Sequence, residues 1–302
     1  MLSLSKVATK IKAYIELVRI HNVVASLLTT IVGWLSVKAY VNVSVDTLLY
    51  AVAIVGLISS AGYVINDYFD VEVDMLNKPY RPIPSGRVSP REALVLSTLL
   101  FVIGVLPSIG LGPYTMFFVL INAFVVFLYS YKVKEMGFVG NVVVSLEGAF
   151  TIVLGALAAA EKIGDINLTN LSMLPALYAF TLLLGREVVK TIEDYKADEA
   201  RKVKSLPRVL GVKKASLISI ALQLLVVAIS PLPLLLGYGV VYLTFALATD
   251  ALIIYSVINS LNMLRSSEPE VIAGKVRSYL KVSIFLGILA FLGDSLLKAL
   301  LF

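Results

Sequence analysis

Cysteine is absent from this chain of 302 residues, and histidine occurs once, as His21. The lack of cysteine excludes disulfide bonds, thiolate metal sites and a cysteine nucleophile. The single histidine argues against a histidine-based metal centre and against a catalytic triad that contains histidine. The chemistry of this protein must therefore be sought in other residue types.

Charged residues are also scarce, because Asp, Glu, Lys and Arg make up 15% of the sequence while 59% is hydrophobic. Soluble domains average about 25% charged residues, so this composition predicts an integral membrane protein. A basic, amphipathic stretch with Lys6, Lys10 and Lys12 leads into the first apolar run without a small-residue cleavage site. We therefore expect that run to be a retained membrane span and not a signal peptide.

The sequence contains long apolar runs with few charged residues. A helix needs about 20 mostly apolar residues to cross the hydrocarbon core of a bilayer. Nine runs meet this requirement, which predicts an all-α, multi-pass protein of the cell membrane with the lipid bilayer around it. The predicted spans are residues 16–38, 46–68, 92–111, 114–131, 139–160, 171–193, 213–233, 237–261 and 279–301.

The 26 Lys and Arg residues are distributed unevenly between the two sides of these spans. All but four fall on the side of the N-terminus, and the exceptions are Lys38, Lys162, Arg186 and Lys298. Because positively charged loops remain in the cytoplasm, the N-terminus is predicted to be cytoplasmic, and nine spans then place the C-terminus outside. The net charge of +6 thus reports topology, and we expect no nucleic-acid partner.

Two acidic motifs end the second and the sixth predicted span. Asn66, Asp70 and Asp74 are spaced at i, i+4 and i+8, and Asp194 and Asp198 at i and i+4. This spacing puts oxygen ligands on one face of each helix, and hard cations such as Mg²⁺ prefer oxygen ligands. A carboxylate in the membrane costs about 2.5–3.5 kcal/mol, so several together indicate a bound cation or a shared function. We therefore predict a magnesium site for a phosphate-bearing substrate.

The two motifs also form an internal repeat. Asp194 and Asp198 repeat the spacing of Asp70 and Asp74 four spans later in the chain. Spans separated by an even number run in the same direction, so both motifs are predicted to lie on the cytoplasmic side. Their acidic faces are expected to meet across a helical bundle.

A basic, proline-rich loop over residues 77–87 follows the first motif. Lys78 and Arg81 supply cations for phosphate oxygens, and the prolines hold the backbone on a stiff, non-helical path. The alternative is an ordinary positively charged cytoplasmic loop. In the sixth span, Arg186 and Lys190 precede the second motif at four-residue steps, and there the alternative is a salt-bridge ladder that satisfies itself.

Further polar residues lie at the predicted cytoplasmic ends of two other spans. Arg19 and Asn22 begin the first span, and Tyr129, Ser130 and Lys132 end the fourth. Taken alone, such residues would be interfacial anchors. Because they share the membrane side with the acidic motifs, they are also candidates for substrate contacts.

At these positions the chain resembles the UbiA superfamily of intramembrane prenyltransferases. The NDxxDxxxD motif of that family matches residues 66–74, and its DxxxD motif matches residues 194–198. The Arg-x-x-Asn at 19–22 and the Tyr-Ser-Tyr-Lys at 129–132 fit two further family elements. The resemblance implies one domain over residues 1–302, with nine transmembrane helices in a ring around an apolar cavity and a cytoplasmic cap over the acidic motifs.

Within the superfamily, residues 77–87 are similar to chlorophyll synthases and to the archaeal digeranylgeranylglyceryl phosphate synthases, and residues 186–207 are similar to the archaeal branch. The chain departs from that branch at Ile20, where proline is usual, and at Ala197, where glycine is common. The resemblance implies transfer of a geranylgeranyl group from geranylgeranyl diphosphate to the hydroxyl of geranylgeranylglyceryl phosphate, in archaeal ether-lipid synthesis. The expected partners are thus a prenyl diphosphate and a lipid-phosphate acceptor.

The resemblance also implies roles for individual residues. Two Mg²⁺ ions, for which Mn²⁺ can substitute, would neutralise the diphosphate leaving group. Asp70 and Asp194 would be catalytic, and Asp67 would help to deprotonate the acceptor. The expected metal ligands are Asn66, Asp70, Asp74, Asp194 and Asp198, and the expected substrate contacts are Arg19, Asn22, Lys78, Arg81, Tyr129, Ser130, Lys132 and Lys190.

Two other functions fit part of the pattern. The first is the same transfer to an aromatic or quinone-precursor acceptor. The second is a secondary transporter, because internal repeats and intramembrane carboxylates also mark coupled carriers. Transporter sites favour broken helices near the midplane of the membrane, whereas these acids lie at one interface beside long basic loops. The prenyltransferase is therefore the preferred prediction.

Overall fold

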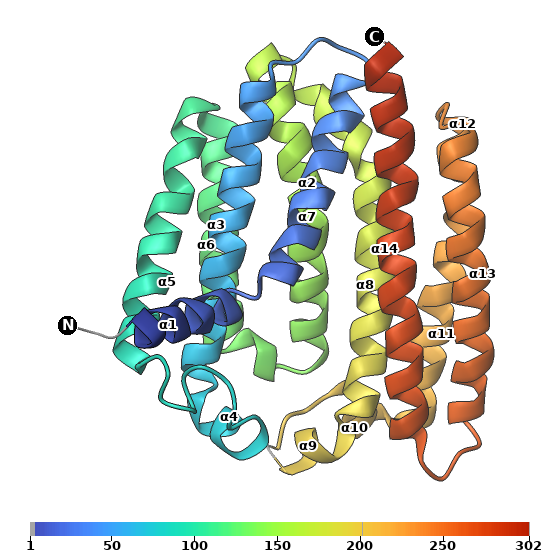
Figure 1. Ribbon diagram of the computed structural model, residues 1–302. Coiled ribbons are helices and arrows are strands. Elements are labelled where there is room, and N and C mark those ends of the chain that lie inside the picture. The colour runs from blue at the N-terminus through green and yellow to red at the C-terminus, as the bar shows by residue number, and fades with distance from the viewer. Residues whose placement is uncertain (1–3, 201, 302) are drawn as a thin grey trace.

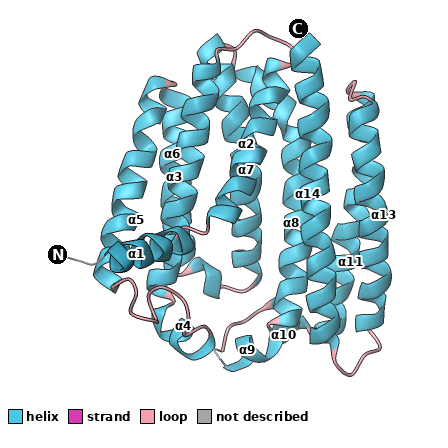
Figure 2. Cartoon of the chain, viewed as in Figure 1, coloured by secondary structure: helices cyan, strands magenta, loops and turns pink. Residues whose placement is uncertain are grey.

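The computed structural model describes residues 4–200 and 202–301, with the side chains of residues 8–199 and 202–301. The described ranges contain helices and loops but no strand (Figures 1 and 2). The α-helices are α1 (Leu4–Leu17), α2 (Ile20–Lys38), α3 (Val45–Phe69), α4 (Val71–Asn77), α5 (Pro90–Val105), α6 (Pro113–Tyr131), α7 (Phe138–Ile163), α8 (Met173–Glu193), α9 (Tyr195–Ala200), α10 (Leu206–Leu210), α11 (Val212–Ile229), α12 (Leu232–Leu235), α13 (Val240–Met263) and α14 (Pro269–Leu301).

Nine of the described helical segments are long and apolar enough to cross a membrane. The predicted all-α class and the predicted number of spans are therefore confirmed. Three segments include a short neighbouring helix, because η1 (Leu106–Gly110) extends α5, η3 (Ile166–Ser172) precedes α8 and α12 extends α11. The ends 1–3 and 302 of the single predicted domain lie outside the described residues.

The first span begins later than predicted, because α1 is a separate helix. The chain leaves α1 at Leu17 and starts α2 at Ile20, with Arg19 between them in the left-handed conformation (φ 52°, ψ 55°). In Figure 1, α1 lies across the long helices instead of along them. Its residues Ala13 and Leu17 are fully buried in one cluster, whereas other apolar residues of α1 stay exposed. This is the amphipathic pattern of a helix at a membrane interface.

Two ion pairs fasten α1 to its neighbours. Arg87, in the loop after α4, donates to both carboxylate oxygens of Glu16 at 2.6 and 3.1 Å. Lys10 pairs with Glu92 in the first turn of α5. The α1 helix is thereby tied to the basic loop that follows the first acidic motif.

Close packing of α2 against α7 depends on two glycines. A Cβ atom on Gly33 would lie 1.8 Å from the carbonyl oxygen of Ile152, and one on Gly155 would lie 2.0 Å from that of Thr30. Lipid tails are as apolar as side chains, so the hydrophobic effect does not drive membrane helices together. Small residues let two helices approach backbone to backbone, and van der Waals contact then holds them together. The position of α2, and of Arg19 at its start, is fixed by this contact.

Candidate active site

The two acidic motifs lie at the same end of the helical bundle. The first spans the junction of α3 and α4, and the second spans the junction of α8 and α9, both at the bottom of Figure 1. Lys78, which directly follows α4, is within electrostatic range of both Asp74 and Asp194. The start of the loop after the first motif therefore lies near the second motif.

The first motif does not form one continuous helical face. Helix α3 ends at Phe69, and Asp70 has the non-helical conformation φ −90°, ψ 5° before α4 begins at Val71. Asn66 and Asp70 lie side by side as their spacing predicted, with a hydrogen bond of 3.0 Å, but the expectation of one continuous helix through Asp74 is wrong, because Asp74 lies in α4. The four polar side chains of the motif divide into two pairs, Asn66 with Asp70 and Asp67 with Asp74.

One pair is Asp67 and Asp74, which share Arg81. The Arg81 guanidinium lies 3.1 Å from Asp67 Oδ1 and 2.5 Å from Asp74 Oδ2. Arg19 forms a second ion pair with the same Oδ1 atom of Asp67. Both carboxylates are buried, so the two guanidinium groups compensate charges that water does not reach.

Arg19 is held in place by the first turn of α2 and by α3. Its guanidinium lies over the ring of Tyr63, 5.3 Å from the centroid, which is a cation–π contact. Asn22 is hydrogen bonded to the hydroxyl of the same Tyr63. Arg19 and Asn22 are thus both held by Tyr63, a residue that the sequence did not single out.

The other pair is Asn66 and Asp70, which bind Lys134. The Asn66 amide donates to Asp70 Oδ2 at 3.0 Å, and Lys134 Nζ lies 2.6 Å from Asp70 Oδ1 and 3.4 Å from Asn66 Oδ1. Lys134 comes from the short helix η2 (Val133–Glu135) after α6. The sequence pointed instead to Lys132, which is exposed and whose side chain forms no hydrogen bond or ion pair with a described residue. The only sequence clue to Lys134 was its position two residues after Lys132, in the same basic segment that follows the fourth predicted span.

The end of α6 holds two more of the predicted residues, of which Tyr129 lies close to the first motif. Ser130 is buried, and Tyr129 lies within electrostatic range of Asp70 and of Glu187 on α8. The adjoining Tyr131 packs edge-on against Phe69 at the end of α3, with ring centroids 5.4 Å apart. These contacts join α6 to α3 at the level of the acidic residues.

The second motif is arranged differently from the first. Asp194 ends α8 with a non-helical conformation (φ −84°, ψ 9°), and its carboxylate forms no hydrogen bond or ion pair with the described residues. Asp198 is buried, at 4% exposure, in the short α9. Arg208 donates to the carbonyl oxygens of Asp198 and Val203, at 3.2 and 2.6 Å, and so folds the following loop back onto α9.

Lys78 is the cation placed between the two motifs. Partial desolvation by the surrounding protein lowers the pKa of its ammonium group, and repulsion from Arg81 and Arg19 lowers it further. Asp74 and Asp194 act in the opposite direction. A positive charge at this position is therefore costly without an anion, which favours binding of a ligand with negative charge.

The residues of both motifs fit a divalent cation by donor type. Carboxylate and amide oxygens of Asn66, Asp70, Asp194 and Asp198 are ligands for a hard cation such as Mg²⁺. In the described part of the chain, no three acidic or histidine side chains converge as a ready-made metal cluster. The first motif is instead neutralised by Arg19, Arg81 and Lys134. A metal would take over the role that these cations have here.

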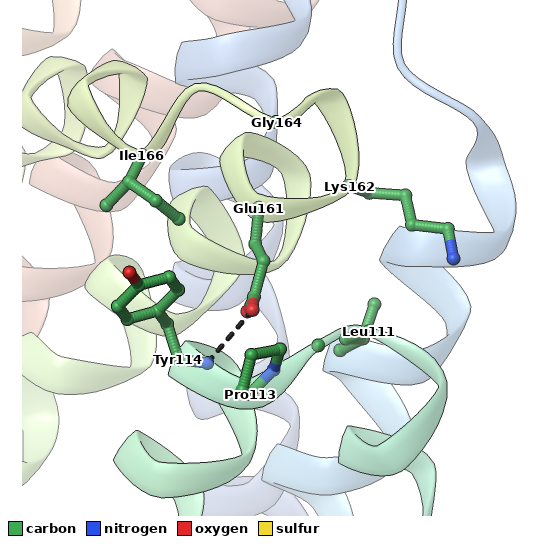
Figure 3. A pocket seen from close by; sticks show the side chains of 8 residues that line it. Leu111, Pro113, Tyr114, Glu161, Lys162, Gly164 and Ile166 are labelled. Atoms are coloured by element: carbon green, nitrogen blue, oxygen red, sulfur yellow. Dashed lines mark hydrogen bonds between the residues drawn. The ribbon is translucent and has the colours of Figure 1, made fainter.

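A surface cavity of about 430 Å³ lies at the opposite end of the bundle, where α6 begins and α7 ends. Figure 3 shows Glu161 pointing at the start of α6, where its two oxygens accept the backbone N–H groups of Tyr114 at 2.9 Å and Thr115 at 2.7 Å. The carboxylate thus caps α6. Because this cavity is remote from both acidic motifs, the motif end remains the candidate active site.

Comparison with known proteins gives a consistent result. The profile of the UbiA prenyltransferase family matches residues 26–291. A digeranylgeranylglyceryl phosphate synthase from Saccharolobus solfataricus is 41% identical over 288 residues, which cover 95% of this chain and 98% of that protein.

Solved structures show the same fold. A structure reported for digeranylgeranylglyceryl phosphate synthase in membranes superposes with a TM-score of 0.76 at 31% identity, over 95% of this chain and 98% of that one. A UbiA homologue from Archaeoglobus fulgidus bound to GPP and Mg²⁺ superposes with a TM-score of 0.58 at 17% identity, over 92% of this chain and 99% of that one.

Proposed function

The chain belongs to the UbiA prenyltransferase family, and from this premise we propose that it transfers a geranylgeranyl group to the hydroxyl of geranylgeranylglyceryl phosphate. The donor is geranylgeranyl diphosphate, and diphosphate is released. The observation that carries the proposal is the meeting of both acidic motifs around Lys78, in a chain 41% identical over nearly its whole length to a digeranylgeranylglyceryl phosphate synthase.

Divalent metal ions complete the proposed site. Asn66, Asp70, Asp74, Asp194 and Asp198 would hold two Mg²⁺ ions, for which Mn²⁺ can substitute. When bound, the ions supply positive charge that stabilises the diphosphate as it leaves. The support for this is the all-oxygen donor set of the two motifs, together with the Mg²⁺ bound to the Archaeoglobus homologue.

The residues that bind the diphosphate are cations already present at the site. Lys78 lies between the motifs, and Arg81 and Lys134 hold the carboxylates of the first motif. Phosphate oxygens accept hydrogen bonds from the same N–H groups as carboxylates do. Arg81 and Lys134 can therefore exchange a carboxylate for a phosphate oxygen when substrate and metal arrive.

The reaction breaks the bond between C1 of the donor and its diphosphate oxygen, and forms a bond between C1 and the acceptor oxygen. The acceptor hydroxyl loses its proton in this step, so a nearby base is needed. Asp67 is the proposed base. Arg19 and Arg81 both bind its Oδ1, which leaves Oδ2 to receive the proton.

The allylic cation that develops at C1 must be shielded from water. Lys and Arg residues gather on the motif side of the spans, while the spans themselves are mostly apolar. A prenyl chain that extends from the acidic motifs into the bundle therefore leaves aqueous surroundings, which suppresses capture of the cation by water.

The proposed orientation places this site and the N-terminus in the cytoplasm and the C-terminus outside. Its support is the concentration of Lys and Arg on the motif side of the spans. Soluble diphosphate released by the reaction would then remain in the cytoplasm.

Product analysis tests the proposal. Purified protein is incubated with geranylgeranyl diphosphate, Mg²⁺ and either geranylgeranylglyceryl phosphate or an aromatic acceptor such as 4-hydroxybenzoate. We expect the ether lipid to be the product and the aromatic acceptor to be ignored. Efficient prenylation of 4-hydroxybenzoate with no reaction of the glyceryl phosphate would overturn the acceptor and leave only the prenyltransferase class.

A further inference from the structure

Three charged side chains lie within α8, on the bilayer side of the second acidic motif. Arg186 Nη1 donates to Glu187 Oε1 at 2.6 Å, and Lys190 Nζ lies 3.5 Å from Glu187 Oε2. Arg186 stands seven residues before the end of α8, so its Cα lies about 10 Å inside that end at 1.5 Å per residue. Ionisable groups at such depth are costly and usually mark a substrate path.

The charges of this group do not cancel. Two bases share one acid, so Arg186, Glu187 and Lys190 carry a net charge of about +1. One nitrogen of Arg186 contacts Glu187, and its remaining N–H donors have no partner among the described residues. A guanidinium has five donors in a planar fork, which suits the oxygens of a phosphate. The salt-bridge ladder that the sequence left open therefore does not satisfy itself.

The group faces the candidate active site. One turn before Glu187, Leu183 packs against Gly148 of α7, so this side of α8 is turned towards α7. Tyr129 of α6 is within electrostatic range of both Glu187 and Asp70. The α8 group and the first acidic motif are thus neighbours, with Tyr129 between them.

Apart from Lys78, which is assigned to the diphosphate, most cations of the site are already engaged or exposed. Arg19, Arg81 and Lys134 hold carboxylates of the first motif, and Arg277 holds Glu193 at 2.8 Å. Lys132, which the sequence predicted to contact substrate, is exposed. Among these cations of the described structure, Arg186 is distinguished by free donors at membrane depth.

We infer that Arg186 and Lys190 bind a phosphomonoester, namely the phosphate of the lipid acceptor, separately from the diphosphate of the donor. This inference rests on the proposed function. A lipid acceptor carries its phosphate at the end of a long apolar chain, so the group that binds it must lie where the apolar spans meet the polar end. The α8 group has that position, with positive charge left over for one anion.

Steady-state kinetics of Arg186→Gln test the inference, with KM measured separately for acceptor and donor. We expect the acceptor KM to rise at least tenfold and the donor KM to change less than threefold. Arg186→Lys keeps the positive charge but loses the planar array of N–H donors, so its acceptor KM should lie between those of Arg186→Gln and the unaltered protein. The matched control is Arg91→Gln, since the side chain of Arg91 is exposed on α5 and forms no hydrogen bond or ion pair with a described residue.

A second acceptor separates the phosphate from the rest of the lipid. The unaltered protein should prefer geranylgeranylglyceryl phosphate over geranylgeranylglycerol, which lacks the phosphate, and Arg186→Gln should lose most of that preference. Should Arg186→Gln fail to accumulate in the membrane, Lys190→Gln, whose side chain is more exposed, is tested for the same loss.

The outcomes are distinguishable. An unchanged acceptor KM and an unchanged preference in Arg186→Gln would overturn the phosphate site alone. A rise in the donor KM without a rise in the acceptor KM would also overturn it, because the group would then serve the diphosphate. If the unaltered protein does not prenylate geranylgeranylglyceryl phosphate at all, the proposed function fails first.

Discussion

Asp70 and Asp194 occupy equivalent places, each at the residue where a long helix gives way to a short one. At both positions the backbone leaves the helical conformation, with φ −90°, ψ 5° at Asp70 and φ −84°, ψ 9° at Asp194. A break of this kind exposes the last carbonyl groups of the helix, and a nearby cation compensates their partial negative charge. The helix ends are thus suited to bring cations and carboxylates together.

Removal of either carboxylate is the first prediction. Asp70→Ala and Asp194→Ala should each reduce the rate of transfer by about 10²–10³, because a diphosphate site that loses one ligand no longer stabilises the leaving group fully. Single-turnover assays at increasing Mg²⁺ measure the effect. Glu72→Ala is the matched control, since Glu72 is exposed and outside the motif spacing. A fully active Asp70→Ala or Asp194→Ala protein would contradict the proposed metal site.

The second prediction concerns the two lysines after α6. Lys134→Gln should raise the donor KM by about tenfold or more, because a charge-assisted contact to the first motif and to the diphosphate is lost. Lys132→Gln should have the smaller effect, since its side chain is exposed. Donor titrations of both proteins provide the comparison. A larger effect at Lys132 would restore the assignment that the sequence favoured.

At the scale of whole elements, the contact between α2 and α7 is the tightest constraint. Gly155→Ala places a methyl group 2.0 Å from the carbonyl oxygen of Thr30, so the two backbones must separate. We expect a destabilisation of about 1–3 kcal/mol, as for other overpacked sites, and a lower thermal midpoint in detergent. Gly287→Ala on α14 is the control, because nothing lies within 4 Å of its added Cβ. Equal midpoints for the two variants would show that the α2–α7 contact is not tight.

The attachment of α1 to the loop after α4 predicts a dependence on pH. The Arg87 guanidinium lowers the pKa of Glu16 below its ordinary value of 4.5. The stabilisation by this pair is therefore complete above pH 4.5 and is lost as the pH falls through the lowered pKa of the folded state. The protection factors of the α1 amides, which correct exchange rates for their intrinsic dependence on pH, should be constant from pH 7 to 5 and should fall in more acidic buffer.

A variant checks that this change arises from the pair. In Glu16→Gln, the protection factors of α1 should be lower already at pH 7, and acidification should lower them little further. Lys10 and Glu92 form the other attachment of α1, so complete release of the helix is not expected. Equal exchange in Glu16→Gln and the unaltered protein would show that the pair does not hold α1.

At the scale of the whole molecule, the nine spans and their connecting loops predict an orientation that labelling can test. The chain has no cysteine, so single cysteines can be introduced without background. Tyr80 lies at the end of the bundle that holds the acidic motifs, and Tyr114 lies at the opposite end. Both are exposed, so Tyr80→Cys and Tyr114→Cys are suitable for labelling. We expect an impermeant thiol reagent added to intact cells to label residue 114 and not residue 80. Labelling of residue 80 from outside would reverse the proposed topology.

Hydropathy and residue spacing by themselves determined the class of this protein, the number of its spans and the end at which its polar residues gather. These properties are local, because a run of apolar residues is long enough to cross a bilayer whatever its neighbours are. The acidic motifs were visible for the same reason. Their residues are close in sequence, so helical spacing alone placed them near one another.

Only the tertiary structure decided which cation each carboxylate binds. Lys134 reaches Asp70 from another helix, Arg81 bridges Asp67 and Asp74, and Arg186 is left with free donors. No sequence spacing encodes these pairs, because they depend on where α3 breaks and on how the loops fold back over the bundle. Electrostatic energy falls with distance through space and is indifferent to distance along the chain. The sequence therefore identified the charged groups, and the fold assigned their partners.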